Sequence, residues 1–123
     1  MKVLSPSKIN FGLWILFKRE DGFHEIRSIF IPIDLCDEIE INYSELTRIT
    51  ATEGPIGDEN IVFKTLKVMS EETGKFLSAD IFINKKIPIG GGLGGGSSNA
   101  ASIIKAVNEM YELKLGIEEM LMI

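Results

Sequence analysis

The sequence is poor in cysteine, in basic charge and in long apolar runs. Its single cysteine, Cys36, allows no disulfide within the chain, which fits a reducing compartment, and is expected to be a small core residue. Lys and Arg number 13 against 18 Asp and Glu, so a net charge of −5 gives no general attraction to nucleic acid or anionic lipid. No apolar stretch is long enough to cross a bilayer, and no basic leader precedes one. We therefore expect a cytoplasmic protein without nucleic-acid or membrane partners.

The 123 residues, 45% of them hydrophobic, are enough for one core and roughly one domain. Alternating or β-rich segments predict strands within 2–17 (one or two, interrupted at Pro6) and at 25–33, 38–43, 47–52 and 79–87. Helical spacing predicts helices at 60–73, ended by Gly74, at 97–113, and after Gly116. The first helix is expected to turn Ile61, Leu66 and Met69 toward the core. The pattern predicts an α+β domain in which helices back a sheet.

Half of the 12 glycines are concentrated in residues 90–96, between an expected strand and an expected helix. Glycine lets the backbone fold tightly around an anion and point N–H groups at it. The start of the following helix adds uncapped N–H groups and a positive dipole end. Ser97, Ser98 and Asn99 can each cap that helix or donate to a phosphate or its metal ion. The run therefore predicts a cradle for phosphate groups.

Three other interpretations of the glycine run are weaker. A Walker motif needs a Lys after its last glycine, and here Ser97 follows Gly96 directly. Gly90, Gly92 and Gly95 fit a dinucleotide fingerprint, but no second strand ending in an acidic residue follows the helix. A flexible linker seldom joins a regular strand to a regular helix.

Two other segments accompany the glycine run. Residues 5–13 read SPSKINFGL, residues 20–26 read EDGFHEI, and residues 88–101 read PIGGGLGGGSSNAA. With ENIV at 59–62, these closely resemble the 4-diphosphocytidyl-2-C-methyl-D-erythritol kinases, a branch of the GHMP kinase superfamily. The wider superfamily shares a shorter Pro-x-x-x-Gly-Leu-Gly-Ser-Ser core, so the tripled glycines and the Gly-Phe-His-Glu segment point to this branch. The resemblance implies the ribosomal-protein-S5-domain-2-like α+β fold, with a mixed sheet backed by helices.

The resemblance also implies ATP and Mg²⁺ as cofactors and a cytidine-diphosphate-linked polyol as substrate. Lys8 matches the catalytic lysine, and Asn10 matches a residue that lines the methylerythritol part of the pocket. Phe23 replaces a more usual tyrosine and would stack on cytosine, whose edge His24 would bind. Phe30 matches an aromatic near the substrate, although core packing explains it equally well.

The positions that match the ATP site lie in three segments, and no cluster of metal-ligating side chains is expected. Asn60, Ile61, Val62 and Lys85 match positions around the ATP base. The other positions are Pro88 and the loop that matches the triphosphate site, namely Gly90, Gly91, Gly92, Leu93, Gly94, Gly95, Gly96, Ser97, Ser98 and Asn99. Asn60 is also a good helix N-cap, so it can serve in both roles.

Members of this family continue for more than the same length again, through a motif that carries the catalytic aspartate and a C-terminal domain. The resemblance thus implies that residues 1–123 are the N-terminal, ATP-binding domain without the C-terminal domain, and that they are inactive alone. Apolar residues near the end predict a helix that needs the missing half or a second copy of the chain as a partner. The alternatives are another GHMP kinase, acting on mevalonate, homoserine or a sugar, and a non-catalytic nucleotide-binding or interaction module.

Overall fold

The computed structural model describes the backbone of residues 1–18, 24–90, 94–121 and 123, and the side chains of these residues outside 9–33. Within this part of the chain, one sheet contains the strands β1 (Lys2–Lys18), β2 (His24–Tyr43), β3 (Arg48–Ala51) and β4 (Ala79–Asn84). Their order is β1-β2-β4-β3. β2 is antiparallel to β1 and β4, whereas β3 and β4 are parallel. The predicted mixed sheet is therefore confirmed.

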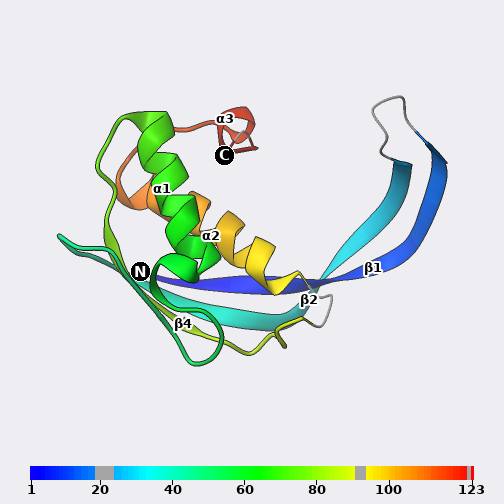
Figure 1. Ribbon diagram of the computed structural model, residues 1–123, viewed down its shortest axis with the longest axis horizontal. Coiled ribbons are helices and arrows are strands. Elements are labelled where there is room, and N and C mark those ends of the chain that lie inside the picture. Colours follow the sequence, from blue (N-terminus) through cyan, green and yellow to red (C-terminus); the bar gives the residue numbers. More distant parts are fainter. Residues whose placement is uncertain (19–23, 91–93, 122) are drawn as a thin grey trace.

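Alternation along the strands separates a buried face of the sheet from an exposed face. Ile39 and Ile41 of β2 and Ile81 and Ile83 of β4 are at most 1% exposed. Their sequence neighbours point the other way, as Phe82 illustrates with 43% exposure. Successive side chains of a strand point to opposite faces, so one face receives the helices. Figure 1 shows α1 (Ile61–Thr73) and α2 (Gly95–Met110) lying over that face.

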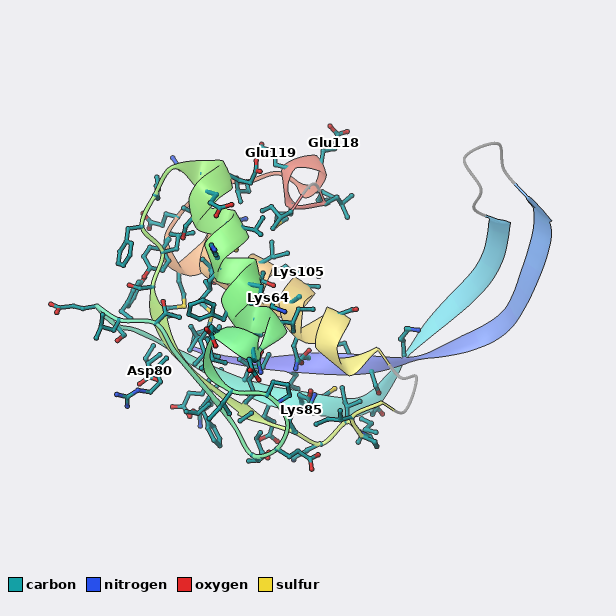
Figure 2. The ribbon with its side chains drawn as sticks, in the orientation of Figure 1. Lys64, Asp80, Lys85, Lys105, Glu118 and Glu119 are labelled. Atoms are coloured by element: carbon teal, nitrogen blue, oxygen red, sulfur yellow. The ribbon has the colours of Figure 1, made fainter. Side chains whose placement is uncertain are left out.

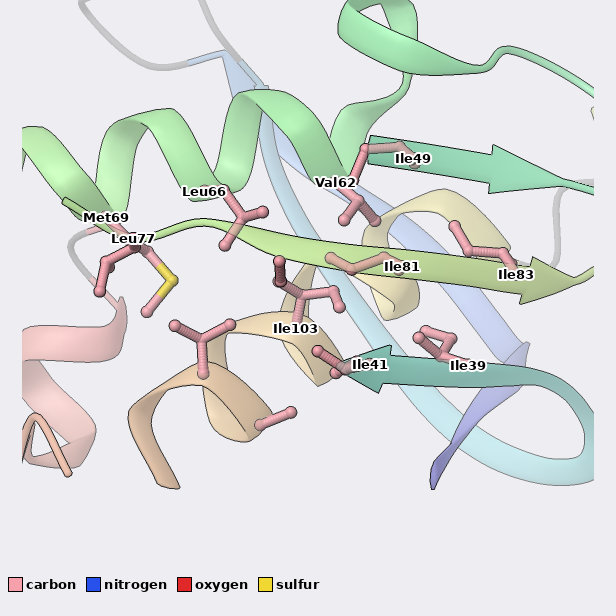
Figure 3. Packing of buried hydrophobic residues seen from close by; sticks show 13 residues of the cluster. Ile39, Ile41, Ile49, Val62, Leu66, Met69, Leu77, Ile81, Ile83 and Ile103 are labelled. Carbon is pink, nitrogen blue, oxygen red and sulfur yellow. The ribbon is translucent and has the colours of Figure 1, made fainter. Parts of the chain in front are cut away.

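The core forms where the two helices meet the isoleucine face of the sheet (Figure 3). α1 contributes Val62, Leu66 and Met69, all at most 2% exposed, and α2 contributes Ile103 and Val107. The prediction for Leu66 and Met69 is confirmed, whereas that for Ile61 is wrong, because Ile61 is 42% exposed. Val62 takes the core position, since the helical period that includes residues 66 and 69 runs back to residue 62.

The ends of α1 follow local capping signals. The Asn60 side chain accepts a hydrogen bond from the Val62 N–H at 2.9 Å, which fixes the helix start. Gly74 adopts a left-handed conformation with φ of 68°, and its N–H donates to the Ser70 carbonyl. Both predicted ends are confirmed. α2 instead begins at Gly95, two residues before the predicted start, and ends at Met110 rather than 113.

Two strand predictions need correction. β1 runs unbroken through Pro6, and the segments predicted separately at 25–33 and 38–43 are one strand, β2. The pairing shifts register there, because Pro6 pairs with Cys36 while Ser7 pairs with Ile33. Such a bulge accommodates a proline, which lacks an N–H for the ladder. Cys36 is half-buried, so its assignment to the core is wrong.

β4 pairs with β2 over residues 38–43, and within the described part of the chain the rest of β2 pairs with β1 alone. In Figure 1 this two-stranded ribbon extends away from the helices.

Two tyrosines fasten the C-terminal end of α2 to the sheet. The rings of Tyr43, at the end of β2, and Tyr111 pack edge to face, with centroids 5.3 Å apart and planes at 75°. The Tyr43 hydroxyl donates to the Met110 carbonyl, and the Tyr111 hydroxyl donates to the Ser78 carbonyl just before β4. These contacts bring β2, β4 and α2 together at one end of the domain.

After α2 the chain packs partly on the core and then forms the short helix α3 (Ile117–Leu121). Leu113, Leu115 and Ile123 contact the core cluster. Ile117 and Leu121 are 74% and 78% exposed, in agreement with the apolar surface expected there. Across the residues that the structure describes, no helix has the length and apolar character that crossing a membrane requires.

Candidate functional site

A cavity of about 270 Å³ opens between the start of α1 and the start of α2. Its wall combines the turn before α1, the end of β4 and the glycine run. The lining residues are Glu53, Pro55, Glu59, Asn60, Ile61, Lys85, Pro88, Ile89, Gly90, Gly94, Gly95, Gly96 and Asn99. Most of them are positions predicted for nucleotide binding, brought together from segments up to about 40 residues apart. Glu53, Pro55, Glu59 and Ile89 are not among the positions that the sequence predicts to bind the nucleotide.

The N-terminal end of α2 forms one side of this cavity. Gly94 is the N-cap residue, with a left-handed φ of 71°, and its carbonyl accepts the first helical hydrogen bond, from Ser98 N–H at 2.9 Å. The prediction that Ser97, Ser98 or Asn99 caps this helix is wrong, because the helix already begins at Gly95. A glycine N-cap has no side chain to occupy the first-turn N–H groups, which leaves the positive helix end available to an anion.

The side chains of Ser98, Val62 and Asn99, three positions predicted for nucleotide binding, differ in their surroundings. The Ser5 hydroxyl on β1 donates to the Ser98 hydroxyl at 3.0 Å, which ties the first turn of α2 to the sheet. Val62 lies in the hydrophobic core and is absent from the cavity wall among the described residues. Asn99 is 4% exposed and lines the cavity, and its Oδ1 has no hydrogen-bond partner within the described part of the chain. A buried acceptor without a donor is costly, so Asn99 is the polar group best placed to gain from a bound donor.

Lys8, the predicted catalytic lysine, lies against the glycine run. A Cβ atom built on Gly94 would be 2.7 Å from Lys8 Cε and 3.0 Å from Lys8 Cγ. The Lys8 side chain therefore occupies the space beside Gly94 and would have to move if that residue carried a side chain. The structure thus brings Lys8 of β1 to the N-terminal end of α2, 86 residues later in the sequence.

Lys85, at the end of β4, is held by a carboxylate that the sequence interpretation missed. Asp37 of β2 is fully buried, and its Oδ2 accepts from Lys85 Nζ at 2.5 Å. Its Oδ1 accepts from the N–H groups of Lys86 and Ile87, at 2.7 and 2.9 Å. Figure 2 shows Lys85 at the end of β4 nearest the start of α2, with Asp80 at the opposite end. The sequence does contain one sign that Asp37 is buried. It alternates along β2 with Ile39 and Ile41, so its side chain points to the same, buried face of the sheet.

The charge state of Asp37 follows from these contacts. Burial by itself would raise the pKa of the carboxyl group. The hydrogen bonds from Ile87, Lys85 and Lys86, with the charge of Lys85, outweigh burial and lower the pKa below its ordinary value of 3.8. Asp37 is therefore ionised at neutral pH. Next to it, Glu38 and Lys86 form a 2.8 Å ion pair with both side chains about half exposed, a kind of pair that contributes little to stability.

This assignment predicts how stability depends on pH. A carboxyl whose pKa is lower in the folded state stabilises the fold above its unfolded pKa and loses that contribution as the pH falls through the folded value. We expect Asp37→Asn to be less stable than the parent at pH 7, with the difference shrinking as the pH falls below about 4. Urea unfolding of both proteins between pH 7 and pH 2.5 measures this difference. A gap that stays constant over that range would contradict an ionised Asp37.

The predicted substrate-binding residues lie mostly outside the described part of the chain. The backbones of Asn10 and Phe30 are register partners in the β1–β2 ribbon, and His24 begins β2 opposite Lys18. Phe23 and the side chains of Asn10, His24 and Phe30 are not among the described groups, and neither are Gly91, Gly92 and Leu93. Their binding roles stay predictions.

Comparisons with known proteins assign the chain to a family. Residues 60–123, which include α1, β4, the glycine run and α2, match the N-terminal domain of the GHMP kinases. The chain therefore belongs to the GHMP kinases, and its residues 60–123 match their N-terminal domain.

Individual relatives show which branch of the GHMP kinases the chain resembles. The chain is 49% identical over 114 residues to the 4-diphosphocytidyl-2-C-methyl-D-erythritol kinase of Persephonella marina, covering 90% of the chain and 42% of that protein. It is 43% identical over 125 residues to the kinase of the same name from Geobacter sp. strain M21, covering 98% and 45%. The chain thus spans less than half the length of these relatives.

Solved structures agree with this assignment. A crystal structure of 4-(cytidine 5'-diphospho)-2C-methyl-D-erythritol kinase superimposes with a TM-score of 0.81 and 34% identity, covering 98% of this chain and 44% of that one. The homoserine kinase of Cytophaga hutchinsonii shares the fold with a TM-score of 0.71 at 18% identity, covering 98% of this chain and 38% of that one. The predicted fold and family are both confirmed.

Proposed function

We propose that residues 1–123 are the ATP-binding domain of a kinase that transfers a phosphoryl group from ATP to a hydroxyl of 4-diphosphocytidyl-2-C-methyl-D-erythritol, in the cytoplasm, as a step of non-mevalonate isoprenoid precursor synthesis. The observation that carries the proposal is the cavity between α1 and α2, which is lined by glycines of the 90–96 run, in a chain that is 49% identical over 114 residues to a kinase of this name. A separate C-terminal domain, as in the longer relatives, would complete the enzyme.

The cavity suits the phosphate groups of ATP. Phosphoryl transfer spreads negative charge over the oxygens of the transferred group, so it needs oriented donors and a fixed cation. The first turn of α2 supplies backbone N–H groups. Lys85, the residue after β4, lines the cavity, and the side chain of Lys8 on β1 packs against Gly94, which also lines it. Lys8 is the proposed catalytic cation, because its side chain packs along the N-cap residue of that helix.

Mg²⁺ is the expected companion of the nucleotide. Among the described residues, no group of three His, Cys, Asp or Glu side chains could hold a metal ion. Mg²⁺ in kinases is commonly bound by one or two carboxylates together with substrate phosphates, and Glu53 and Glu59 on the cavity wall offer such carboxylates. Bound there, the ion would neutralise charge on the phosphate oxygens.

The catalytic base is not assigned to these residues. In the proposed reaction a base removes the hydroxyl proton, and we propose that an aspartate in a further part of the kinase supplies it, as the resemblance to the family implies. The chain alone is expected to bind ATP without turnover. The exposed Ile117 and Leu121 on α3 are the proposed contact with that second part or, as a weaker alternative, with another copy of the chain.

A chimera tests the function directly. The matching N-terminal part of the Persephonella marina kinase is replaced by this chain, and ADP release is followed with 4-diphosphocytidyl-2-C-methyl-D-erythritol, mevalonate or homoserine. We expect turnover only with the cytidine-containing substrate. Turnover with another alcohol would favour a different GHMP kinase. ATP binding by the chain in calorimetry, with no turnover by a folded chimera, would favour a non-catalytic nucleotide-binding module.

A further inference from the structure

Asp37 lies behind the cavity wall and contacts three successive residues that lead into the glycine run. It binds the side chain of Lys85 and the backbone N–H groups of Lys86 and Ile87. Asp37 does not line the cavity, and neither does any other residue of β2 whose side chain the structure describes. Its three contacts fix both the direction of the chain after β4 and the place of the Lys85 ammonium group.

The Lys85 ammonium group is next to the start of α2. A Cβ atom built on Gly95, the first residue of that helix, would lie 3.4 Å from Lys85 Nζ. A cation at the positive end of a helix is unfavourable unless an anion lies beside it. Asp37 is such an anion, with its Oδ2 at 2.5 Å from Lys85 Nζ.

We propose that Asp37 is a positioning residue for phosphate recognition, which holds Lys85 at the N-terminal end of α2 so that its ammonium group can bind the nucleotide phosphates. The inference rests on the proposed function, in that the ligand is ATP. An ammonium group has three N–H donors. Asp37 accepts from one of them, so in the proposed arrangement the other two donate to phosphate oxygens in the cavity that Lys85 lines.

The neighbouring pair gives a natural control. Glu38 follows Asp37 on β2 and binds Lys86, the residue after Lys85, at 2.8 Å. The Glu38–Lys86 pair, like the Asp37–Lys85 pair, joins a carboxylate of β2 to a lysine that follows β4. Both of its side chains are about half exposed, and neither lines the cavity. Glu38→Gln therefore removes an equivalent charge without disturbing the proposed contact.

The test measures binding of ATP and of adenosine to the intact chain and its variants by calorimetry. Asp37→Asn keeps an oxygen that can accept from Lys86 and Ile87 but loses the charge that holds Lys85. We expect about a tenfold loss of ATP affinity, corresponding to one charge-assisted hydrogen bond, and unchanged adenosine affinity. Glu38→Gln should stay within about twofold of the parent. Lys85→Met should also lose about tenfold, and the double variant should lose little more than either single one, because both changes remove the same interaction.

Several results would overturn the inference. Additive losses in the double variant, or equal losses for ATP and adenosine, would mean that Asp37 acts only on the fold. Unchanged ATP affinity in Lys85→Met would remove the contact that Asp37 is proposed to position. If Asp37→Asn does not fold, ¹⁵N NMR of the lysine ammonium groups in the parent chain replaces it. The Lys85 signal should then shift with ATP and not with adenosine, and the absence of a shift would reject the inference. A parent chain that binds no ATP would instead reject the proposed function, and the inference with it.

Discussion

Gly94→Val is expected to lower ATP affinity by roughly a hundredfold, to or below the limit of calorimetry, while the domain stays folded. Two costs meet at this position. A β-branched residue is a genuine outlier at φ of 71°, and its Cβ would lie 2.7 Å from the Lys8 side chain. Relief of either cost moves the loop or Lys8 away from the cavity. Together they amount to about 3 kcal/mol, which corresponds to the stated loss.

Gly74→Val is the matched control for this substitution. Gly74 has nearly the same left-handed φ, 68°, but no atom lies within 4 Å of its Cβ position, and it ends α1 away from the cavity. The control should lose similar backbone stability and keep its ATP affinity. If both variants lose affinity equally, the loss comes from general destabilisation. If Gly94→Val binds ATP as the parent does, the phosphate groups are held elsewhere.

The largest expected effect on stability belongs to Ile81→Ala. Ile81 is fully buried on β4, the strand that pairs with both β2 and β3, and packs against both helices' core residues. Removing a buried isoleucine side chain costs about 2–5 kcal/mol through lost burial and the cavity that remains. Since domains are stable by only about 5–15 kcal/mol, much of the stability would be lost. Urea unfolding followed by circular dichroism measures the change.

Phe82→Ala provides the comparison on the same strand. Phe82 is larger than Ile81 but points to the open face of the sheet and is 43% exposed. Its removal should cost no more than about 1 kcal/mol. A cost as large as that of Ile81→Ala would mean that the open face is covered in solution.

The features that the sequence predicts well are those encoded by neighbouring residues. Asn60 and Gly74 mark the ends of α1 because capping depends on residues within one turn. The glycine run likewise predicts a cavity at the strand-to-helix junction, and the structure has one there. The sequence predicts the start of α2 two residues too late, because glycines are poor helix formers and local propensity disfavours a helix start at Gly95.

The features that the sequence does not predict depend on distant contacts. Asp37 meets its partners 48 to 50 residues later in the chain, and Ser5 meets Ser98 after 93 residues. No local pattern specifies such pairs. The continuous course of β2 through the bulge opposite Pro6 is a similar case, since it depends on pairing with β1 rather than on propensity.

The edge-to-face tyrosine pair lets tyrosine and tryptophan signals report on different parts of this domain. Tyr43 and Tyr111 are the only tyrosines in the sequence, and both report on the junction of β2 with the end of α2. The single tryptophan, Trp14, lies instead in the part of β1 that pairs with β2 alone, opposite Arg27. Near-ultraviolet circular dichroism of tyrosine and fluorescence of tryptophan therefore follow two separate regions. Unfolding transitions that differ between the two signals would reveal that the ribbon and the helix-covered sheet melt independently, without any label being attached.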